Sequence, residues 1–203
     1  TQCRQLGVEI KYETEATAKL LKEEKADTVI LATGSNPVVP PIPGLAESSR
    51  VCLAKDLLEG RVKPGAECVV IGGGQVGAET AHFLAQMLRK VTVLEMAGAI
   101  AADAALAVNW HLISSLEKRK VQLLTHATVS EVTEEGVVYK DQNGELHTIA
   151  ADTVVVAAGY RANNPLGEEL KDSGMDVKVV GDAVRARKVM HATREGFDAG
   201  RSI

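Results

Sequence analysis

A pattern that occurs twice places the strongest limit on how this chain can fold. Lys25–Gly34 and Ala150–Gly159 share the letters Ala-Asp-Thr-Val, continue as apolar runs, and end in Ala-Thr-Gly and Ala-Ala-Gly. Apolar runs of this length are typical of strands buried on both faces of a parallel sheet. Upstream, Val8–Ile10 echoes Val121–Leu123. We therefore expect two domains of one fold, with the closing elements of both present in this sequence.

The second copy begins with a glycine-rich turn between a strand and a helix, whereas the first copy has no such start. Cys68–Ile71 predicts a buried strand, and Gly72–Gly77 follows it directly. Ala78–Lys90 predicts the helix, because apolar residues recur there at helical spacing. The residues expected on its inner face are Ala81, Leu84 and Leu88. We expect the missing start of the first domain to lie upstream of Thr1.

The rest of the sequence continues this alternation and then changes to a meander. Strands are expected over Val91–Leu94, Val121–Leu124, Val129–Thr133, Val137–Lys140, Leu146–Ile149 and Thr153–Val156, and over a final run, Val177–Val180, that leads into Gly181 and Asp182. Helices are expected from Asp103 as N-cap to Lys118, with Leu106, Ile113 and Leu116 inward, and from about His191. The chain is thus predicted to be α/β, a Rossmann-like parallel sheet with a β-meander, plus truncated remnants of a second domain of that type.

Prolines and the limits of the repeat divide the chain into four stretches. Prolines gather between residues 37 and 43, so residues 35–65 are expected to form a crossover linker. Residues 1–34 are assigned to the C-terminal part of the first domain, and residues 66–159 to the Rossmann domain. Residues 160–203 belong to neither copy and are expected to return to the first domain.

The glycine-rich turn has the spacing of a dinucleotide-binding fingerprint. Gly72 permits a tight turn, Gly74 lets the backbone approach a pyrophosphate, and Gly77 lets helix and strand pack closely. The phosphates would lie against unpaired N–H groups at the positive end of the helix. The intervening residues expected at the same site are Gly73, Gln75 and Val76. The alternative is a tight strand–helix turn that binds no ligand.

The end of the next strand indicates which dinucleotide would bind. Glu95 follows Gly72 at roughly the 20-residue distance of the acid that hydrogen-bonds the ribose hydroxyls. Its carboxylate would repel a 2′-phosphate, and Met96–Ala102 contains no Arg or Lys to receive one. Arg89 and Lys90 precede the strand and are expected at its opposite end. The sequence therefore favours NADH over NADPH. The alternative is that Glu95 is a surface acid at a strand end.

With these segments in place, the chain resembles the pyridine nucleotide–disulfide oxidoreductase family of flavoproteins. In that family an inserted NAD(P)H domain interrupts an FAD domain of the same fold, which implies that residues 1–34 and 160–203 belong to the FAD-binding domain. Thr33 and Gly34 resemble the element where the chain leaves that domain, and Gly159 ends the counterpart that closes the NAD(P)H domain. Gly181 and Asp182 resemble the element whose Asp contacts the ribityl chain of FAD.

Two longer segments, Gly72–Ala81 and Gly181–Lys188, resemble the branch of dienoyl-CoA reductase, enoate reductase and trimethylamine dehydrogenase. The branch implies a larger parent whose old-yellow-enzyme-like barrel carries FMN and an iron–sulfur cluster. The implied function is an NADH-dependent flavoprotein oxidoreductase, in which electrons pass from NADH through FAD to a barrel that reduces an enoate or dienoyl-CoA-type substrate. One alternative is a non-catalytic module that holds ADP in a trimethylamine dehydrogenase-like enzyme. The other, a simple Rossmann dehydrogenase, is disfavoured by the repeat and the meander.

No side chain is assigned a catalytic role, because the cofactors carry the redox chemistry. Glu79 resembles a family glutamate near the nicotinamide, and its alternative is a first-turn acid favoured by the helix dipole. Because the FAD fingerprint is expected upstream of Thr1, this stretch alone is not expected to hold FAD firmly. Cys3, Cys52 and Cys68 form no Cys-x-x-x-x-Cys pair, so disulfide reduction is not predicted.

Composition narrows the partners that can be expected. A formal net charge of -4 without a basic block argues against nucleic acid. No apolar run approaches the roughly 20 residues that cross a bilayer. The five histidines lack metal-ligand spacing, so no metal is predicted, and the scattered cysteines fit a reducing cytoplasm. The expected partners are NADH, the remainder of the parent chain and, in a homo-oligomer, further copies of the parent.

Overall fold

The chain alternates short strands and helices, and its internal contacts divide it into two units. In the computed structural model, which describes residues 2–203, one unit is Pro37–Tyr160. The other combines the residues up to Asn36 with Arg161–Ile203. The chain passes between the units through β2 (Ser35–Pro37) and β11 (Tyr160–Ala162), which pair with each other.

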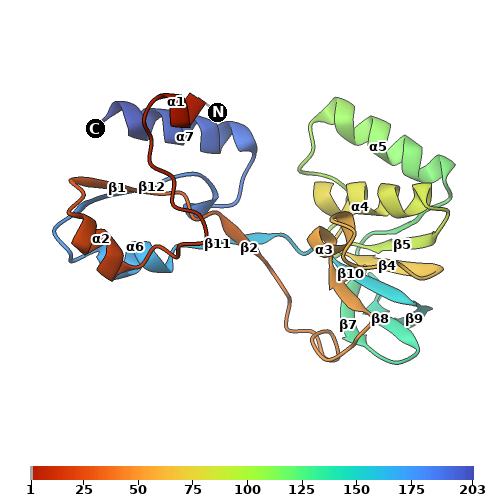
Figure 1. Ribbon diagram of the computed structural model, residues 1–203. Helices are drawn as coiled ribbons and strands as arrows, with labels where there is room; N and C mark the ends of the chain where they lie inside the picture. Colours follow the sequence, from red (N-terminus) through yellow and green to blue (C-terminus); the bar gives the residue numbers. More distant parts are fainter. Residues whose placement is uncertain (1) are drawn as a thin grey trace. The chain divides into compact units, whose positions relative to one another are not determined.

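A parallel sheet forms the centre of Pro37–Tyr160. Its five strands lie in the order β3-β10-β4-β5-β6, and all neighbours run parallel (Figure 1). The strands are β3 (Val51–Leu53), β4 (Glu67–Ile71), β5 (Lys90–Leu94), β6 (Gln122–Leu124) and β10 (Thr153–Val156). The central strands are almost wholly buried, which apolar and β-branched residues covered on both faces favour. The predicted α/β class and Rossmann-like parallel sheet are confirmed.

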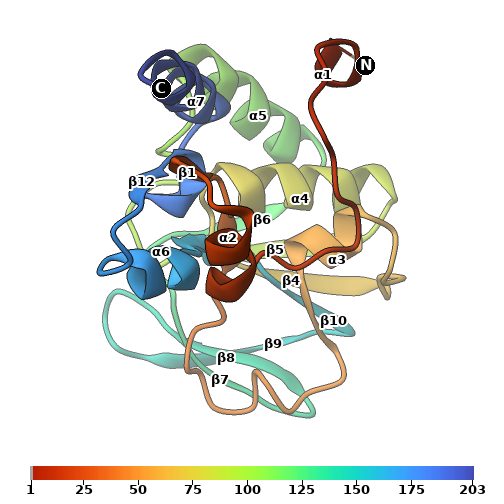
Figure 2. The ribbon, with the colours of Figure 1, turned by 60° about the vertical axis from the view of Figure 1, so that its left-hand side comes forward.

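The two faces of this sheet are covered by different structures. The helices α3 (Ala54–Leu58), α4 (Gln75–Gln86) and α5 (Leu106–Lys118) lie on one face, where Val70 and Val93 point. The predicted meander covers the other face, where Val69 and Ile71 point (Figure 1, Figure 2). Its antiparallel strands are β7 (Thr128–Val132), β8 (Gly136–Lys140) and β9 (Leu146–Ala150). Alternation along β4 therefore supplies both cores.

Residues 35–65, expected to be a linker, are partly built into this unit. The proline-rich beginning is a loop as expected, but Val51–Leu53 forms the edge strand β3 and pairs with β10. Helix α3 then buries Ala54 and Leu57 against the helix-side core. The apolar run after the prolines is short, and it becomes a strand because a parallel partner lies beside it.

Helix α4 ends earlier than Lys90, the predicted end, and Leu88 does not face the core. Leu88 is 89% exposed and has a left-handed backbone, with φ at +59°. The Leu88 N–H donates to the Ala85 carbonyl at 3.1 Å, and the Arg89 N–H donates to the Leu84 carbonyl at 3.2 Å. These two bonds define a Schellman C-cap. The chain must turn here because β5 begins at Lys90.

A Leu88→Gly substitution is expected to stabilise the protein by about 1 kcal/mol, because leucine at a left-handed position carries a steric cost that glycine avoids. The exposed leucine contributes little packing that could be lost. The measurement is urea unfolding followed by far-ultraviolet circular dichroism, which reports the loss of helices such as α4. Met87→Gly is the control, since Met87 has φ at -80° and should lose stability. Equal changes in both variants would contradict the prediction.

The start of α5 also differs from the prediction. The N-cap is Ala105, without a side-chain bond, because Asp103 lies in the preceding turn. The Asp103 carboxylate instead accepts the backbone N–H of Gln75 in α4, at 2.7 Å. Leu106, expected inward, is 87% exposed because the helix begins there and turns it away from the sheet. The inward prediction is confirmed for Leu116, which is fully buried.

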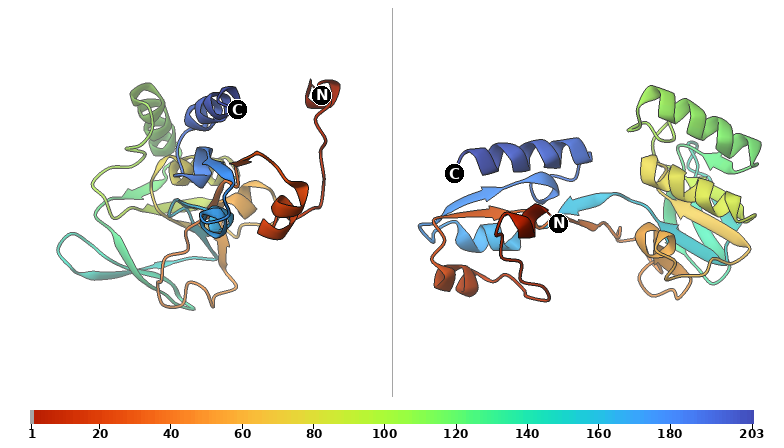
Figure 3. Two further views of the ribbon diagram at one scale, coloured as in Figure 1. Left: turned by 90° about the vertical axis from the view of Figure 1, so that its left-hand side faces the viewer. Right: turned by 45° about the horizontal axis from the view of Figure 1, so that its top comes forward.

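The second unit contains two paired parallel strands, β1 (Thr28–Leu31) and β12 (Asp176–Val179). The helices α2 (Ala18–Glu24) and α6 (Pro165–Leu170) pack on one side of them, and α7 (Val189–Arg201) lies on the other (Figure 3). The remaining pieces are α1 (Gln2–Gln5) and the 3-10 turn Gly181–Ala183. Strand β1 matches β10 of the other copy, as predicted.

The upstream part of the repeat is not reproduced in the structure. Val8–Ile10 forms no strand and is exposed, whereas the corresponding Val121–Leu123 leads into β6. Thr17 then caps helix α2 through a bond from the Leu20 N–H, whereas the strand β7 of the meander follows β6 in the other unit. Across residues 2–203, no helix is both long and apolar enough to cross a membrane.

Candidate functional site

A cleft of about 510 Å³ opens where β4 and β10 end, beside the first turn of α4. The order of the strands reverses at this place in the sheet. From β4 the chain winds outward through β5 and β6, and it then returns to β10 on the other side of β4. Ligands of open parallel sheets bind at the carboxyl ends of strands where the winding reverses. The cleft therefore lies where the topology alone would place a ligand.

The structure brings six of the nine predicted nucleotide-site residues into this cleft. They are Gly72, Gly74, Gln75, Val76, Glu95 and Gly159. Gly73 and Gly77 lie behind the turn as packing positions. Glu79 does not line the cleft. Its carboxylate accepts the side-chain amide of Gln75 at 2.9 Å, and it borders a separate hollow between α4 and α5.

A side chain would meet different surroundings at each of the three glycines of the fingerprint. Gly72 has φ at +99°, and a Cβ there would lie 2.5 Å from the Ala157 carbonyl oxygen. At Gly77 a Cβ would overlap the Gly72 carbonyl oxygen. Gly74 has neither constraint, because its φ is -63° and its nearest neighbour would be an Asp103 oxygen at 3.7 Å. The fold itself therefore requires Gly72 and Gly77, whereas it leaves the space in front of Gly74 open.

Glu95 is held in a fixed orientation at the end of β5. One carboxylate oxygen accepts the Gly73 N–H at 2.6 Å, and the other accepts the Ala97 N–H at 2.7 Å. Each carboxylate oxygen has more than one acceptor site, so two further hydrogen bonds can still be received. Lys90 lies at the start of the strand, paired with Glu67 at 2.7 Å, as expected for the far end of β5.

Several cleft residues were not predicted as site residues. They include Met96, Thr128, Val129 and Asp103. Asp103 was interpreted as a cap of its own helix, and no local pattern could show that it reaches α4. Among residues 2–203, the cleft lining contains two carboxylates, Glu95 and Asp103, and no Lys, Arg or His.

A second hollow, of about 480 Å³, lies in the other unit. Its lining includes three of the four residues predicted to contact FAD, which are Gly34, Gly181 and Asp182. Asp182 accepts the Arg187 N–H at 3.1 Å and the Ser35 hydroxyl at 3.4 Å. The fourth residue, Thr33, does not line the hollow, because its hydroxyl donates to the Asn163 carbonyl.

One residue that lines this second hollow, Arg187, forms an ion pair. Arg187 contacts Glu195 of α7 at 2.6 Å, and Glu195 also accepts the Gly181 N–H at 2.8 Å. The Arg187 hydrogen bond, followed by the Gly181 N–H, holds the pKa of Glu195 below its ordinary value. Glu195 therefore ties α7 to the Gly-Asp turn.

Two of the three cysteines are poor nucleophiles. Burial raises the pKa of the Cys52 thiol to about 11, with a further contribution from Asp56. Burial likewise raises the pKa of Cys68 to about 11. Because the thiolate is the reactive form, these two residues are packing groups at neutral pH.

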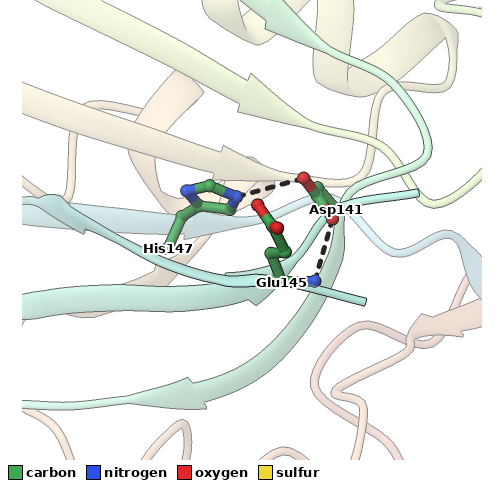
Figure 4. A group of neighbouring side chains, drawn as sticks. All are labelled: Asp141, Glu145 and His147. Carbon is green, nitrogen blue, oxygen red and sulfur yellow. Dashed lines mark hydrogen bonds and ion pairs between the residues drawn. The ribbon is translucent and has the colours of Figure 1, made fainter. Parts of the chain in front are cut away.

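Asp141, Glu145 and His147 gather at the turn between β8 and β9 (Figure 4). Asp141 accepts the backbone N–H groups of Asn143 and Glu145, both at 2.9 Å, and lies 3.2 Å from the His147 ring nitrogen. Desolvation raises the pKa of Asp141, but the bonds from Glu145 and His147 outweigh it and hold the pKa below its ordinary value. These contacts explain the cluster as a hairpin turn.

Comparisons with known proteins agree with this geometry. The family described as pyridine nucleotide-disulphide oxidoreductase matches residues 4–190. A metal reductase of Desulforamulus reducens is 35% identical over 97% of this chain, and an NADH oxidase of Thermoanaerobacter brockii is 39% identical over 97%. The chain covers 34% and 31% of these two proteins, so it spans about a third of their length.

Solved structures give the same result. A 2-naphthoyl-CoA reductase superimposes with a TM-score of 0.89 at 33% identity, covering 100% of this chain and 31% of its own. Histamine dehydrogenase from Rhizobium sp. 4-9 superimposes with a TM-score of 0.80 at 18% identity, covering 100% of this chain and 35% of its own. At that identity the second likeness concerns the fold alone.

Proposed function

Because the chain belongs to the pyridine nucleotide-disulphide oxidoreductase family, we propose that Pro37–Tyr160 binds NADH and positions it to reduce FAD. The observation that supports this most directly is the open space in front of Gly74. That space lies at the switch point of a parallel sheet, beside the start of a twelve-residue helix. A tight turn without a ligand explains Gly72 and Gly77 by packing. At position 74, the N-cap of α4, glycine is favoured by capping, but packing does not require it, because the fold leaves room there.

Different residues of the cleft contact different parts of the dinucleotide. The pyrophosphate lies over Gly74, where the first turn of α4 offers backbone N–H groups and the positive end of the helix dipole. Glu95, already oriented by the Gly73 and Ala97 N–H groups, accepts the ribose hydroxyls. Gly159, which follows β10, also lines the cleft and has no side chain to obstruct the rest of the dinucleotide.

The other unit supplies contacts to FAD. Gly34, Gly181 and Asp182 line its hollow, and the Asp182 carboxylate is held by Arg187 and Ser35 with acceptor sites to spare. That arrangement fits a hydroxyl-rich ligand such as the ribityl chain. With both cofactors bound, the cleft residues would hold NADH and the residues of the second hollow would hold FAD, and the cofactors would supply the hydride chemistry.

In the whole protein, we propose that electrons pass from FAD to FMN and an iron–sulfur cluster in a separate barrel. The final acceptor would then be an enoate or a dienoyl-CoA-type substrate. Relatives named cinnamate reductase, at 34% identity, and 2-naphthoyl-CoA reductase, at 33%, support a substrate with a conjugated acyl group. The metal reductase and the bilirubin reductase, at 35% and 37% identity, show how widely the named substrates of relatives vary.

NADH is expected to bind this chain about 10-fold more tightly than NADPH, because the Glu95 carboxylate accepts ribose hydroxyls and repels a 2′-phosphate. Calorimetric titration with both nucleotides measures the difference. Glu95→Gln removes the charge but keeps only one acceptor oxygen, so it gives up the bond from Gly73 or from Ala97. Loss of the charge should still improve NADPH binding relative to NADH. Glu95→Ala should weaken NADH binding and narrow the difference. Equal or tighter binding of NADPH to the unchanged protein would contradict the role of Glu95, and no binding of either nucleotide would contradict the proposed function.

A further inference from the structure

We propose that the Asp103 carboxylate competes with the pyrophosphate of a dinucleotide for the start of α4. The inference rests on the proposed function, because it concerns access to the same site. It assigns Asp103 a part in setting the affinity of the cleft, although Asp103 belongs to neither the glycine turn nor the strand-end acid.

The position of the Asp103 carboxylate is the first support. One of its oxygens accepts the N–H of Gln75, the first residue of α4, at 2.7 Å. The three atoms nearest to a Cβ on Gly74 would be the Asp103 carboxylate oxygens and their carbon, at 3.7 to 4.0 Å. The carboxylate therefore faces the space that Gly74 leaves open. It already receives the hydrogen bond and dipole attraction that an anionic ligand would use.

Charge is the second support. A dinucleotide pyrophosphate carries two negative charges, and within the described residues the cleft lining offers no basic side chain to balance them. Glu95 is fixed at the ribose end by two backbone bonds, so it cannot withdraw without losing both. Asp103 has one such bond. A pyrophosphate at the start of α4 would meet Asp103 as a like charge at hydrogen-bonding range, so Asp103 must leave.

The loop around Asp103 permits this departure without rearranging the fold. Its base is fixed, because the Ala101 N–H donates to the Gly73 carbonyl at 2.6 Å and the Asn109 amide donates to the Ile100 and Ala101 carbonyls. Ile100 and Ala101 are buried, whereas Asp103 is exposed. Rotation of one side chain into solvent therefore clears the helix start.

Competition between Asp103 and the pyrophosphate predicts opposite effects on stability and on ligand affinity. Asp103 stabilises the fold by accepting a helix N–H, and it lowers the apparent affinity for a phosphate ligand because the ligand must displace it. Removing the side chain should therefore lower the melting temperature and raise the affinity. A residue that merely supports the shape of the site would lower both.

The test uses ADP-ribose, which has the pyrophosphate, and adenosine, which has no phosphate. Asp103→Ala should bind ADP-ribose about 10-fold more tightly than the unchanged chain and melt at a lower temperature, with adenosine binding unchanged. Asp103→Asn keeps the acceptor and removes the charge, so it should bind more tightly while melting closer to the unchanged chain. Asp141→Ala is the matched control. Asp141 also accepts backbone N–H groups in a turn, but it lies outside the cleft, so its variant should melt lower without a change in affinity.

Unchanged or weaker ADP-ribose binding by both Asp103 variants, with the unchanged chain still binding, would overturn the inference and leave the proposed function intact. If Asp103→Ala fails to fold, the affinity of Asp103→Asn for ADP-ribose shows whether Asp103 competes with the pyrophosphate or only supports the shape of the site. Absence of ADP-ribose and NADH binding in every variant and in the unchanged chain would overturn the proposed function, and this inference with it.

Discussion

A Gly74→Val substitution is expected to weaken dinucleotide binding by at least about 100-fold while the protein keeps its fold. The fold should survive because Gly74 has φ at -63° and ψ at -178°, an extended conformation that valine adopts readily. A Cβ there would meet Asp103 no closer than 3.7 Å, at ordinary contact distance.

Binding should fail because the valine fills the space that the pyrophosphate needs. The phosphates would be held away from the first N–H groups of α4, and two hydrogen bonds to a charged group, each worth about 1.5 kcal/mol or more, would be lost. Their sum corresponds to roughly a 100-fold change in the dissociation constant. Titration with NADH measures the loss, and circular dichroism together with the fluorescence of Trp110 checks the fold. A folded variant with nearly unchanged NADH affinity would show that the dinucleotide lies elsewhere.

The repeat and the glycine turn were sufficient to predict the sheet and the place of the cleft at its edge, because both depend on local sequence. The apolar runs of β4, β5 and β10 can be buried in few ways, and a glycine turn after such a strand leads into a helix. Glu95 was found by its distance along the chain. These features are each encoded within a short segment.

The failures share a different cause, which is that they depend on contacts between segments far apart in the sequence. Asp103 contacts the start of a helix that lies well upstream, so its cap role was given to the nearer helix α5. Leu88 continues the apolar spacing of α4, yet the need to begin β5 at Lys90 forces a left-handed turn there. Val8–Ile10 resembles a strand, but in the described part of the chain it has no neighbour to pair with.

A Gly77→Val substitution lies three residues along the same fingerprint. Unlike Gly74→Val, which is expected to affect binding, it is expected to destabilise the fold by about 3 kcal/mol. Gly77 is buried in the first turn of α4. A Cβ there would overlap the Gly72 carbonyl oxygen and would approach the Gly72 carbonyl carbon at 3.0 Å and the Ala157 Cβ at 3.4 Å. Two of these three atoms belong to the backbone of the turn, so relief requires α4 to move away from β4.

Comparison of the two valine variants separates packing from ligand contact, because the chemical change is the same. Valine is a better helix former than glycine, so intrinsic propensity alone would make Gly77→Val slightly stabilising. A loss of stability must therefore come from the contact with Gly72. Urea unfolding followed by circular dichroism should give a much lower midpoint for Gly77→Val, whereas Gly74→Val should lose only about 1 kcal/mol, the cost of valine at a helix N-cap. If Gly77→Val were equally stable, α4 would not pack against the glycine turn as closely as the structure places it, and the distinction between fold-required and ligand-required glycines would fail.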